Sequence, residues 1–147
     1  IGDAAHAIVP FYGQGMNSGF EDCFIFSKLI DQYNGDWQNI FEDFQQSRKP
    51  DTDAIAQLAI DNFIEMRDKV ADRKFRLKKK IDRILNEKYP EQWIPQYSMV
   101  TFTDIPYSVA QNKGELQDQI LEKIISEVSP EKLEETDLSN YIASLTI

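Results

Sequence analysis

The residues best suited to chemistry lie in the first 23 positions of the chain. They read Ile-Gly-Asp-Ala-Ala-His-Ala-Ile-Val-Pro-Phe-Tyr-Gly-Gln-Gly-Met-Asn-Ser-Gly-Phe-Glu-Asp-Cys. Asp3 follows a glycine, and Gly13, Gly15 and Gly19 lead into a segment with helical spacing. A glycine-rich turn at a helix N-terminus brings backbone N–H groups close to a negatively charged or electron-rich ligand. The spacing therefore predicts a ligand-binding loop.

Several other kinds of site fit the composition poorly. His6 is the single histidine, so a histidine-based metal centre is not expected. Cys23 is the single cysteine, which excludes an internal disulfide bond and is typical of a reducing compartment. A formal net charge of −9 and a pI near 4.6 argue against a nucleic-acid-binding function.

The length and hydropathy are those of one ordinary domain. The 147 residues, of which 41% are hydrophobic, suffice for a buried core. No apolar run approaches the roughly 18 residues of a membrane span, and no signal peptide opens the chain. We therefore expect a cytoplasmic protein without a membrane anchor in this chain. Because the chain begins without methionine and at its most informative loop, we also expect it to be the C-terminal part of a longer polypeptide.

The opening motif resembles that of a known family. Gly2-Asp-Ala-Ala-His6 followed by Pro10-x-x-Gly-Gln-Gly-Met-Asn17 is similar to the second flavin signature of single-component FAD-dependent aromatic-ring monooxygenases. Asp61–Arg67 and Trp93–Phe102 resemble substrate-side segments of the kynurenine-hydroxylating branch. The resemblance covers about residues 1–107 and implies the C-terminal part of an α/β FAD-binding fold. The Gly-x-Gly-x-x-Gly domain that holds the FAD pyrophosphate is missing from this chain.

The resemblance assigns the opening loop to the flavin. It implies that Asp3 hydrogen-bonds the ribityl chain of FAD, while the backbone from Gly13 to Asn17 covers the pyrimidine edge of the ring. The helix beginning near Met16 would direct its positive end at the side of the reduced flavin that carries negative charge. The implied FAD-binding residues are Asp3, Pro10, Gly13, Gly15, Met16 and Asn17. A cap at Asp3 and plain turn glycines are the structural alternatives.

The resemblance also implies a substrate site for L-kynurenine, with NADPH and O₂ as co-substrates. Asn62 and Tyr97 are similar to the pair that binds the amino-acid carboxylate in these hydroxylases, and both side chains are hydrogen-bond donors. The arginine of that clamp is expected upstream of this chain. The implied substrate-binding residues are Pro10, Phe11, Gln14, Asn62, Met66 and Tyr97. Phe11 and Met66 equally fit core positions, and no catalytic side chain is expected because the flavin supplies the chemistry.

Two other interpretations stay open. Another aromatic hydroxylase, acting on a phenol or a different aryl acid, would keep the Gly-Asp signature but would not need Asn62 beside Tyr97. Alternatively, the chain acts as a helical module without catalysis. The nine basic residues between Arg67 and Arg83 are typical of a solvated helix face, and attraction of the NADPH phosphates is the less favoured interpretation.

Helices are the main elements expected to position these residues. Helical spacing predicts a helix from Met16 to about Tyr33 and a second helix, capped by Asp36, that Pro50 interrupts. A third helix is expected from Asp51 to about Val70, followed by a basic one. The first helix has a predicted buried stripe, made of Phe20, Cys23, Phe24, Ser27, Leu29 and Ile30.

The second half of the chain is expected to contain one non-helical segment. Residues 96–103 are β-branched and aromatic, which favours an extended segment or short strand. Two acidic helices are predicted from Gly114 and from Ser129-Pro130. The chain then divides into a flavin-contacting loop and helix at 1–33, a helical substrate-side region at 34–107, and acidic C-terminal helices at 108–147.

Overall fold

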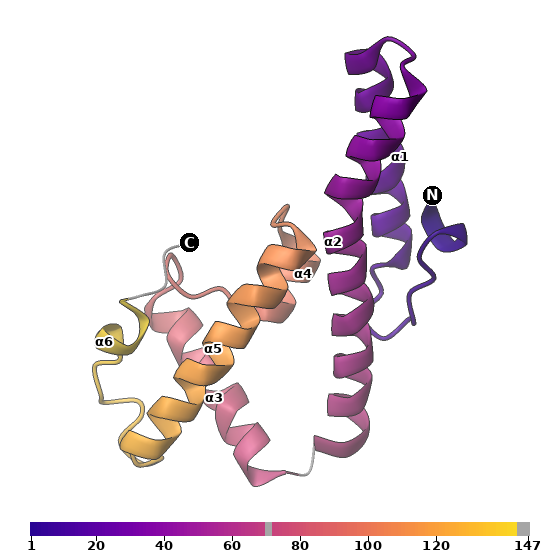
Figure 1. Ribbon diagram of the computed structural model, residues 1–147. Helices are drawn as coiled ribbons and strands as arrows, with labels where there is room; N and C mark the ends of the chain where they lie inside the picture. Colours follow the sequence, from indigo (N-terminus) through magenta and orange to yellow (C-terminus); the bar gives the residue numbers. More distant parts are fainter. Residues whose placement is uncertain (70–71, 144–147) are drawn as a thin grey trace. The chain divides into compact units, whose positions relative to one another are not determined.

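The computed structural model describes residues 1–69 and 72–143, and every regular element in these ranges is helical (Figure 1). The mainly helical fold predicted from the sequence is therefore confirmed. The chain forms two compact units: the first unit is Ile1–Ile64 with Pro106–Ser108, and the second is Glu65–Ile105 with Val109–Ile147. The elements are the 3-10 helix η1 (Gly2–Ala4), α1 (Gly15–Tyr33), α2 (Trp37–Ile64), the π-helix η2 (Glu65–Lys69), α3 (Arg73–Lys88), α4 (Gln96–Phe102), α5 (Tyr107–Glu127) and α6 (Ser139–Ile142).

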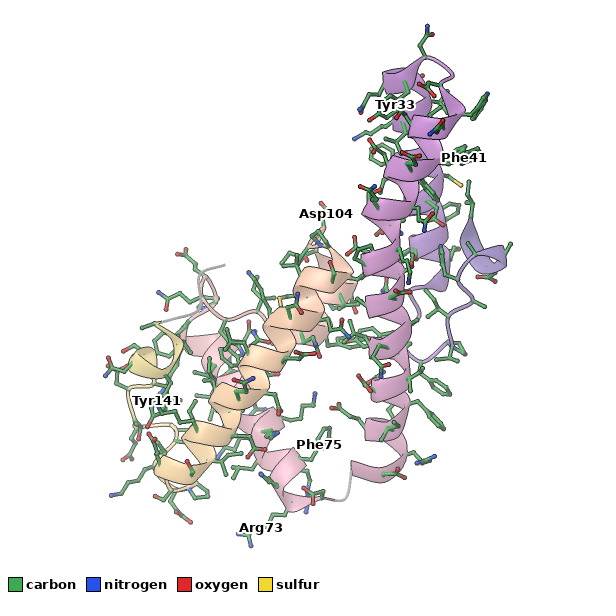
Figure 2. All side chains as sticks on the ribbon, in the orientation of Figure 1. Tyr33, Phe41, Arg73, Phe75, Asp104 and Tyr141 are labelled. Atoms are coloured by element: carbon green, nitrogen blue, oxygen red, sulfur yellow. The ribbon has the colours of Figure 1, made fainter. Side chains whose placement is uncertain are left out.

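The first unit is an antiparallel hairpin of α1 and α2, with η1 packed beside α1 (Figure 1). The turn follows from its sequence, because Asn34 and Gly35 adopt positive φ angles of 48° and 87° that end α1. Asp36 then accepts a hydrogen bond from the N–H of Asn39 at 3.4 Å, as an N-cap does. Tyr33 and Phe41 lie near this turn (Figure 2). The predicted start of α2 at Asp36 is confirmed.

The predicted buried stripe of α1 is wrong. Phe20 and Phe24 are 65% and 61% exposed, and Cys23 and Ser27 are exposed as well. The buried residues of α1 are instead Ser18 and Asp22, one helical turn apart. Spacing identifies which residues share a face, but here the fully buried positions of α1 are small and polar, while Phe26, which is only half-buried, contacts Phe41 and Phe44 of α2. Phe20 and Phe24, like Trp37 and Phe41 of α2, remain in contact with water.

Pro50 does not interrupt the second helix, contrary to the prediction. It lies inside α2, which is continuous from Trp37 to Ile64. A proline inside a helix loses one backbone hydrogen bond, at a cost of about 3 kcal/mol. Buried side chains lie on both sides of it, from Ile40 to Ala59, and they hold the helix together. The predicted end near Val70 is outside the described residues.

The second unit has a hydrophobic core between α3, α5 and α6. Trp93 is fully buried in it, and its Nε1–H donates to Asp82 Oδ1 at 2.7 Å. Burial raises the pKa of Asp82 above its ordinary value, despite the Trp93 hydrogen bond and the nearby charge of Lys79. The core residues are Ile81, Ile84, Leu85, Trp93, Ile120, Leu121, Ile124, Leu133, Leu138 and Ile142.

Three predicted boundaries in the second half are wrong. Residues 96–103 are not extended, because Gln96–Phe102 is the helix α4, which buries Met99 and Val100; this tertiary burial outweighs local β propensity. Gly114 lies inside α5, where a side chain would collide with the Gln96 side chain that donates to Ala110 O. Ser129 and Pro130 open a series of turns instead of a helix, in which Lys132 N–H donates to Ser129 O.

The basic stretch between Arg67 and Arg83 is partly neutralised within the second unit. Lys78 of α3 pairs with Asp118 at 2.5 Å and with Glu122 at 2.7 Å, and Lys74 pairs with Glu122 at 2.6 Å. The acidic face of α5 therefore packs along the basic face of α3. Within residues 1–69 and 72–143, no helix combines the length and apolar character that crossing a membrane requires.

Candidate functional site

The opening loop is attached to the hairpin through Asp22, a fully buried residue of α1. Asp22 Oδ2 accepts the backbone N–H of Gly2 at 2.9 Å and contacts His6 Nε2 at 2.5 Å. The segment between these two residues closes on itself, since the N–H groups of Ala5 and His6 both donate to Gly2 O. Gly2 has a φ of 59°, a left-handed conformation that favours glycine. One carboxylate thus holds both ends of the turn that carries Asp3.

Arg48 of α2 holds the other oxygen of the same carboxylate. Its Nε–H donates to Asp22 Oδ1 at 2.7 Å, and the guanidinium also donates to Ser18 O and Ser18 Oγ, both at 3.2 Å. A further ion pair joins Arg48 to Glu21 at 3.0 Å. The Arg48 side chain is 4% exposed and that of Asp22 is 1% exposed, so the pair is shielded from solvent.

The hydrogen bonds to Asp22 keep its carboxylate charged. Burial by itself would raise the pKa of Asp22, but the N–H of Gly2, the Arg48 guanidinium and His6 together lower the pKa below its ordinary value. A carboxylate that accepts several donors retains its charge in the interior. Asp22, Arg48 and His6 therefore form a buried polar cluster beneath the loop.

The start of α1 leaves open space beside its glycines. Gly13 has a φ of 72°, and no heavy atom lies within 4 Å of where a Cβ would stand at Gly13 or Gly15. Gln14 is the N-cap residue but forms no side-chain cap hydrogen bond. The positive end of α1 is therefore open to an electron-rich group. Asp3 is exposed on η1, as contact with a ligand polyol requires.

Gln14 and Asn17 contact each other beside this helix end. Asn17 Nδ2–H donates to Gln14 Oε1 at 2.8 Å, and Tyr107 Oη–H donates to the same oxygen at 3.5 Å. The Gln14 side chain is buried, whereas Met16 is 71% exposed. Burial and the neighbouring charge of Glu21 raise the pKa of Tyr107 well above its usual value, so its hydroxyl stays protonated. Gln14 thus supports the loop, and its predicted contact with substrate is untested.

The structure connects Asn62 with the loop as well. Asn62 Nδ2–H donates to the backbone carbonyl of Phe11 at 2.6 Å, and the Phe11 ring packs on Phe63 with a centroid distance of 4.4 Å. Phe11 remains 38% exposed, and its neighbour Pro10 is exposed too. The predicted substrate residues Pro10, Phe11 and Asn62 therefore belong to one part of the first unit.

The remaining predicted substrate residues belong to the second unit. Met66 lies in η2 and is 60% exposed, so it is not an ordinary core methionine in this chain. Tyr97 lies in α4, 49% exposed, with its ring edge-on to Phe102 at a centroid distance of 6.3 Å. A short π-helix such as η2 is frequently found at functional sites. The predicted pairing of Tyr97 with Asn62 stays a prediction.

Sequence reasoning missed Asp22 and Arg48. Asp22 closes the motif and stands four residues after Ser18, so an acid and a hydroxyl on one helix face were a possible signal. Arg48 is 26 residues away from Asp22, and no spacing rule connects the two. Only the packing of α1 against α2 brings them together.

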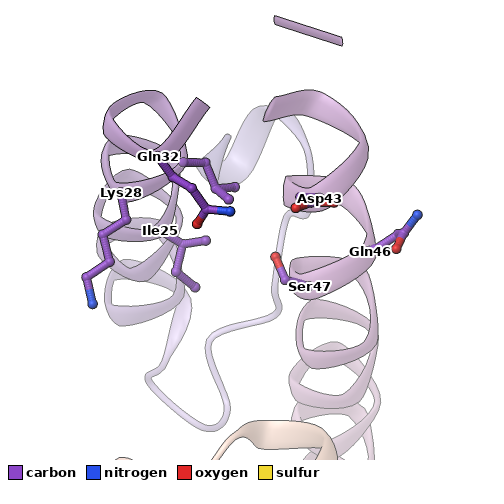
Figure 3. A pocket seen from close by; sticks show the side chains of 7 residues that line it. Ile25, Lys28, Gln32, Asp43, Gln46 and Ser47 are labelled. Carbon is purple, nitrogen blue, oxygen red and sulfur yellow. The ribbon is translucent and has the colours of Figure 1, made fainter. Parts of the chain in front are cut away.

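A concave feature of the hairpin lies away from the opening loop. It is an open hollow between α1 and α2, where Ile25, Lys28 and Gln32 face Asp43 and Ser47 (Figure 3). Its residues are not those of the motif. Among the described residues, no group of three or more histidine, cysteine and acidic side chains is arranged to hold a metal ion.

The opening loop falls within a match to a known family. Residues 1–59, which include η1, α1 and most of α2, match a family model described as an FAD binding domain. The chain is 53% identical over 125 residues to kynurenine 3-monooxygenase of Flavobacterium johnsoniae, which covers 85% of this chain and 28% of the relative. It is 47% identical over 146 residues to kynurenine 3-monooxygenase of Christiangramia forsetii. That match covers 99% of this chain and 33% of the relative. The relative of that name from Caenorhabditis elegans is 46% identical over 129 residues, a match that covers 88% of this chain and 28% of the relative.

Residues 1–59 thus match an FAD binding domain, and most of the chain is similar to part of flavin-dependent monooxygenases, as the motif predicted. The particular relatives are kynurenine 3-monooxygenases, from bacteria and an animal. The chain spans about a third or less of the length of these relatives.

Proposed function

We propose that this chain belongs to an enzyme that hydroxylates L-kynurenine to 3-hydroxykynurenine, with FAD as cofactor and NADPH and O₂ as co-substrates. The observation that carries the proposal is the 47% identity to a kynurenine 3-monooxygenase over 146 of the 147 residues. Bound FAD would supply the redox chemistry, in which hydride comes from NADPH, one oxygen atom of O₂ goes to the ring and the other leaves as water. The chain's own residues bind and orient the flavin and the substrate and shield them from water.

The flavin side of the site is assigned to the opening loop. Asp3 accepts hydrogen bonds from hydroxyl groups of the ribityl chain, and the backbone from Gly13 to Asn17 lies against the pyrimidine edge. The N–H groups of the first turn of α1, together with the helix dipole, stabilise negative charge on that edge, an effect of about 0.3–1 kcal/mol. The open backbone beside Gly13 and Gly15 supports this placement.

The substrate side is assigned on the resemblance. Pro10 and Phe11 supply apolar surface for the aromatic ring, and Gln14 a hydrogen bond. Asn62 of the first unit and Tyr97 of the second are donors for the substrate carboxylate, and Met66 packs near the ring. Exclusion of water by such apolar side chains protects a reactive oxygen donor from wasteful decay.

The chain by itself is proposed to bind FAD weakly or not at all, because it lacks the Gly-x-Gly-x-x-Gly motif that grips the pyrophosphate. Titration of the 147-residue chain with FAD is expected to leave the flavin absorption spectrum unchanged. Tight binding with a perturbed flavin spectrum would contradict this part of the proposal.

The activity is tested with the complete enzyme that carries this chain. Purified with FAD, it should consume NADPH and form 3-hydroxykynurenine from L-kynurenine, with no hydroxylation of 4-hydroxybenzoate. Activity on 4-hydroxybenzoate without activity on kynurenine would favour the other aromatic hydroxylase. Absence of both would favour the helical module.

A pair of tyrosine variants tests the substrate assignment. Tyr97→Phe removes the hydroxyl assigned to the carboxylate and should raise KM for kynurenine by about tenfold, the loss of one hydrogen bond to a charged group. Tyr141→Phe is the control, because the Tyr141 hydroxyl donates to Glu127 on the exposed surface of the second unit. Equal KM values for the two variants would contradict the role of Tyr97.

A further inference from the structure

We propose that Asp22 and Arg48 are positioning residues for the flavin-contacting turn, in that they fix Asp3 relative to the N-terminus of α1. This inference rests on the proposed function, since it concerns the residues that face FAD. Neither residue is part of the surface assigned to flavin or substrate, because both side chains are buried. They act through the turn at Gly2–Ala4.

The turn at Gly2–Ala4 is held against α1 by the Asp22 carboxylate. Asp22 Oδ2 accepts the N–H of Gly2, the residue immediately before Asp3, and also contacts His6 Nε2. Gly19, three residues before Asp22 on α1, packs against the turn. A Cβ atom added at Gly19 would lie 3.7 Å from Gly2 Cα. The turn is thus joined to α1 by contact with a helix glycine and by one carboxylate.

Arg48 sets the orientation of the Asp22 carboxylate. A carboxylate has two oxygens, and Arg48 occupies Oδ1 at 2.7 Å, which leaves Oδ2 for Gly2 and His6. Arg48 is itself fixed by Ser18 O and Oγ, one helical turn before Asp22. A guanidinium has several donors in a rigid plane, so it holds one orientation where an ammonium would not.

Helix α1 carries both Asp22 and the helix end that is assigned to the flavin. Gly15 begins α1, and Asp22 follows two turns later on the same rigid helix. Asp22 therefore sets the distance between the exposed Asp3 carboxylate and the open N-terminus of α1. Because binding of a rigid ligand by two groups requires both at the correct spacing, small displacements of one group reduce affinity.

Two variants of the complete enzyme test the proposal, with FAD affinity of the apoenzyme as the measurement. Asp22→Asn keeps the size but has one acceptor oxygen, so it cannot serve both Arg48 and Gly2. Arg48→Lys keeps the charge but loses the planar fork. Both should raise the Kd for FAD by about tenfold to hundredfold, as expected from one lost hydrogen bond to a charged group. The control is Lys49→Gln, at the residue next to Arg48 on α2, which removes the exposed ion pair of Lys49 with Asp53. This variant should change the Kd for FAD by less than about twofold.

Local hydrogen exchange separates positioning from general stability. In the apoenzyme variants, the N–H groups of Gly2, Ala5 and His6 should exchange faster, while those of the second-unit core around Ile124 exchange at the wild-type rate. Variants that stay folded and bind FAD within about twofold of the wild type would overturn the proposal. So would loss of folding in both variants, because the two residues would then be purely structural.

The outcomes also distinguish this proposal from the proposed function. A wild-type enzyme that binds no FAD would contradict the proposed function, whereas hydrogen exchange at Gly2, Ala5 and His6 would still decide whether Asp22 and Arg48 hold the turn. If Asp22→Asn alone fails to fold, Arg48→Lys decides, since it retains the positive charge beside Asp22.

Discussion

Removal of Arg48 is expected to cost much of the stability of the first unit. Arg48→Met keeps an unbranched apolar stem of similar reach but leaves Asp22, whose side chain is 1% exposed, without its guanidinium partner. Removing one partner of a buried ion pair costs about 3–5 kcal/mol. Asp22 retains the Gly2 N–H and His6, so we expect the lower end, about 3 kcal/mol in the free energy of unfolding. A domain has only about 5–15 kcal/mol in total.

A double-mutant cycle measures this coupling by urea unfolding, followed by circular dichroism, of the 147-residue chain. Asp22→Leu and Arg48→Met should each destabilise strongly, while the double variant should cost less than their sum by about 1–3 kcal/mol. The matched control is Lys49→Met, whose pair with Asp53 has both side chains 63% exposed and should be worth at most about 1 kcal/mol. Strictly additive costs, or a loss below 1 kcal/mol for Arg48→Met, as in a surface pair, would refute the reasoning.

Three further predictions concern acid and helix continuity. The pKa of Asp22 is lowered in the folded state, so the contribution of its carboxylate to stability is present above the ordinary pKa of 3.8 and is lost as the pH falls through the lower folded value. The difference in free energy of unfolding between wild type and Asp22→Asn, measured by urea titration, should therefore shrink in acid. Burial raises the pKa of Asp82, so its contribution is complete below 3.8 and is lost as the pH rises through the folded pKa. Asp82→Asn keeps an acceptor for Trp93 and should be at least as stable as wild type at pH 7, an advantage that should shrink at pH 3, where the wild-type carboxyl is protonated; clear destabilisation at pH 7 would mean that the charge is needed. Pro50→Ala restores a helix N–H and should raise the free energy of unfolding by up to about 3 kcal/mol in thermal melts, and an unchanged or lower melting temperature would show that α2 has adapted to the proline.

Local sequence signals predicted the hairpin ends well and its packing poorly. Asn34, Gly35 and Asp36 set their own backbone geometry, so the turn between α1 and α2 was readable from those residues alone. Which face of α1 is buried depends on the partner helix, and apolar spacing selected Phe20 and Phe24 instead of Ser18 and Asp22. Burial of a polar face requires an opposing cation, and that cation is distant in sequence.

The candidate site shows the same division. The turn at Gly13 was readable from the sequence because its positive φ favours glycine, whereas the flavin role of Gly13 and Gly15 and the carboxylate role of Asn62 stay predictions. The helix at 96–102 was missed because burial of Met99 and Val100 decides its conformation, not the β propensity of its neighbours. Arg48 was missed for a similar reason, since its partners come from another helix.

The exposed aromatic rings of the hairpin have a practical consequence for work with this chain. Phe20, Phe24, Trp37 and Phe41 each present more than half of their surface to water. Such rings bind hydrophobic dyes and promote self-association as the concentration rises. Light scattering of the purified chain should therefore increase with protein concentration and with sulfate, and decrease when these four positions are made polar.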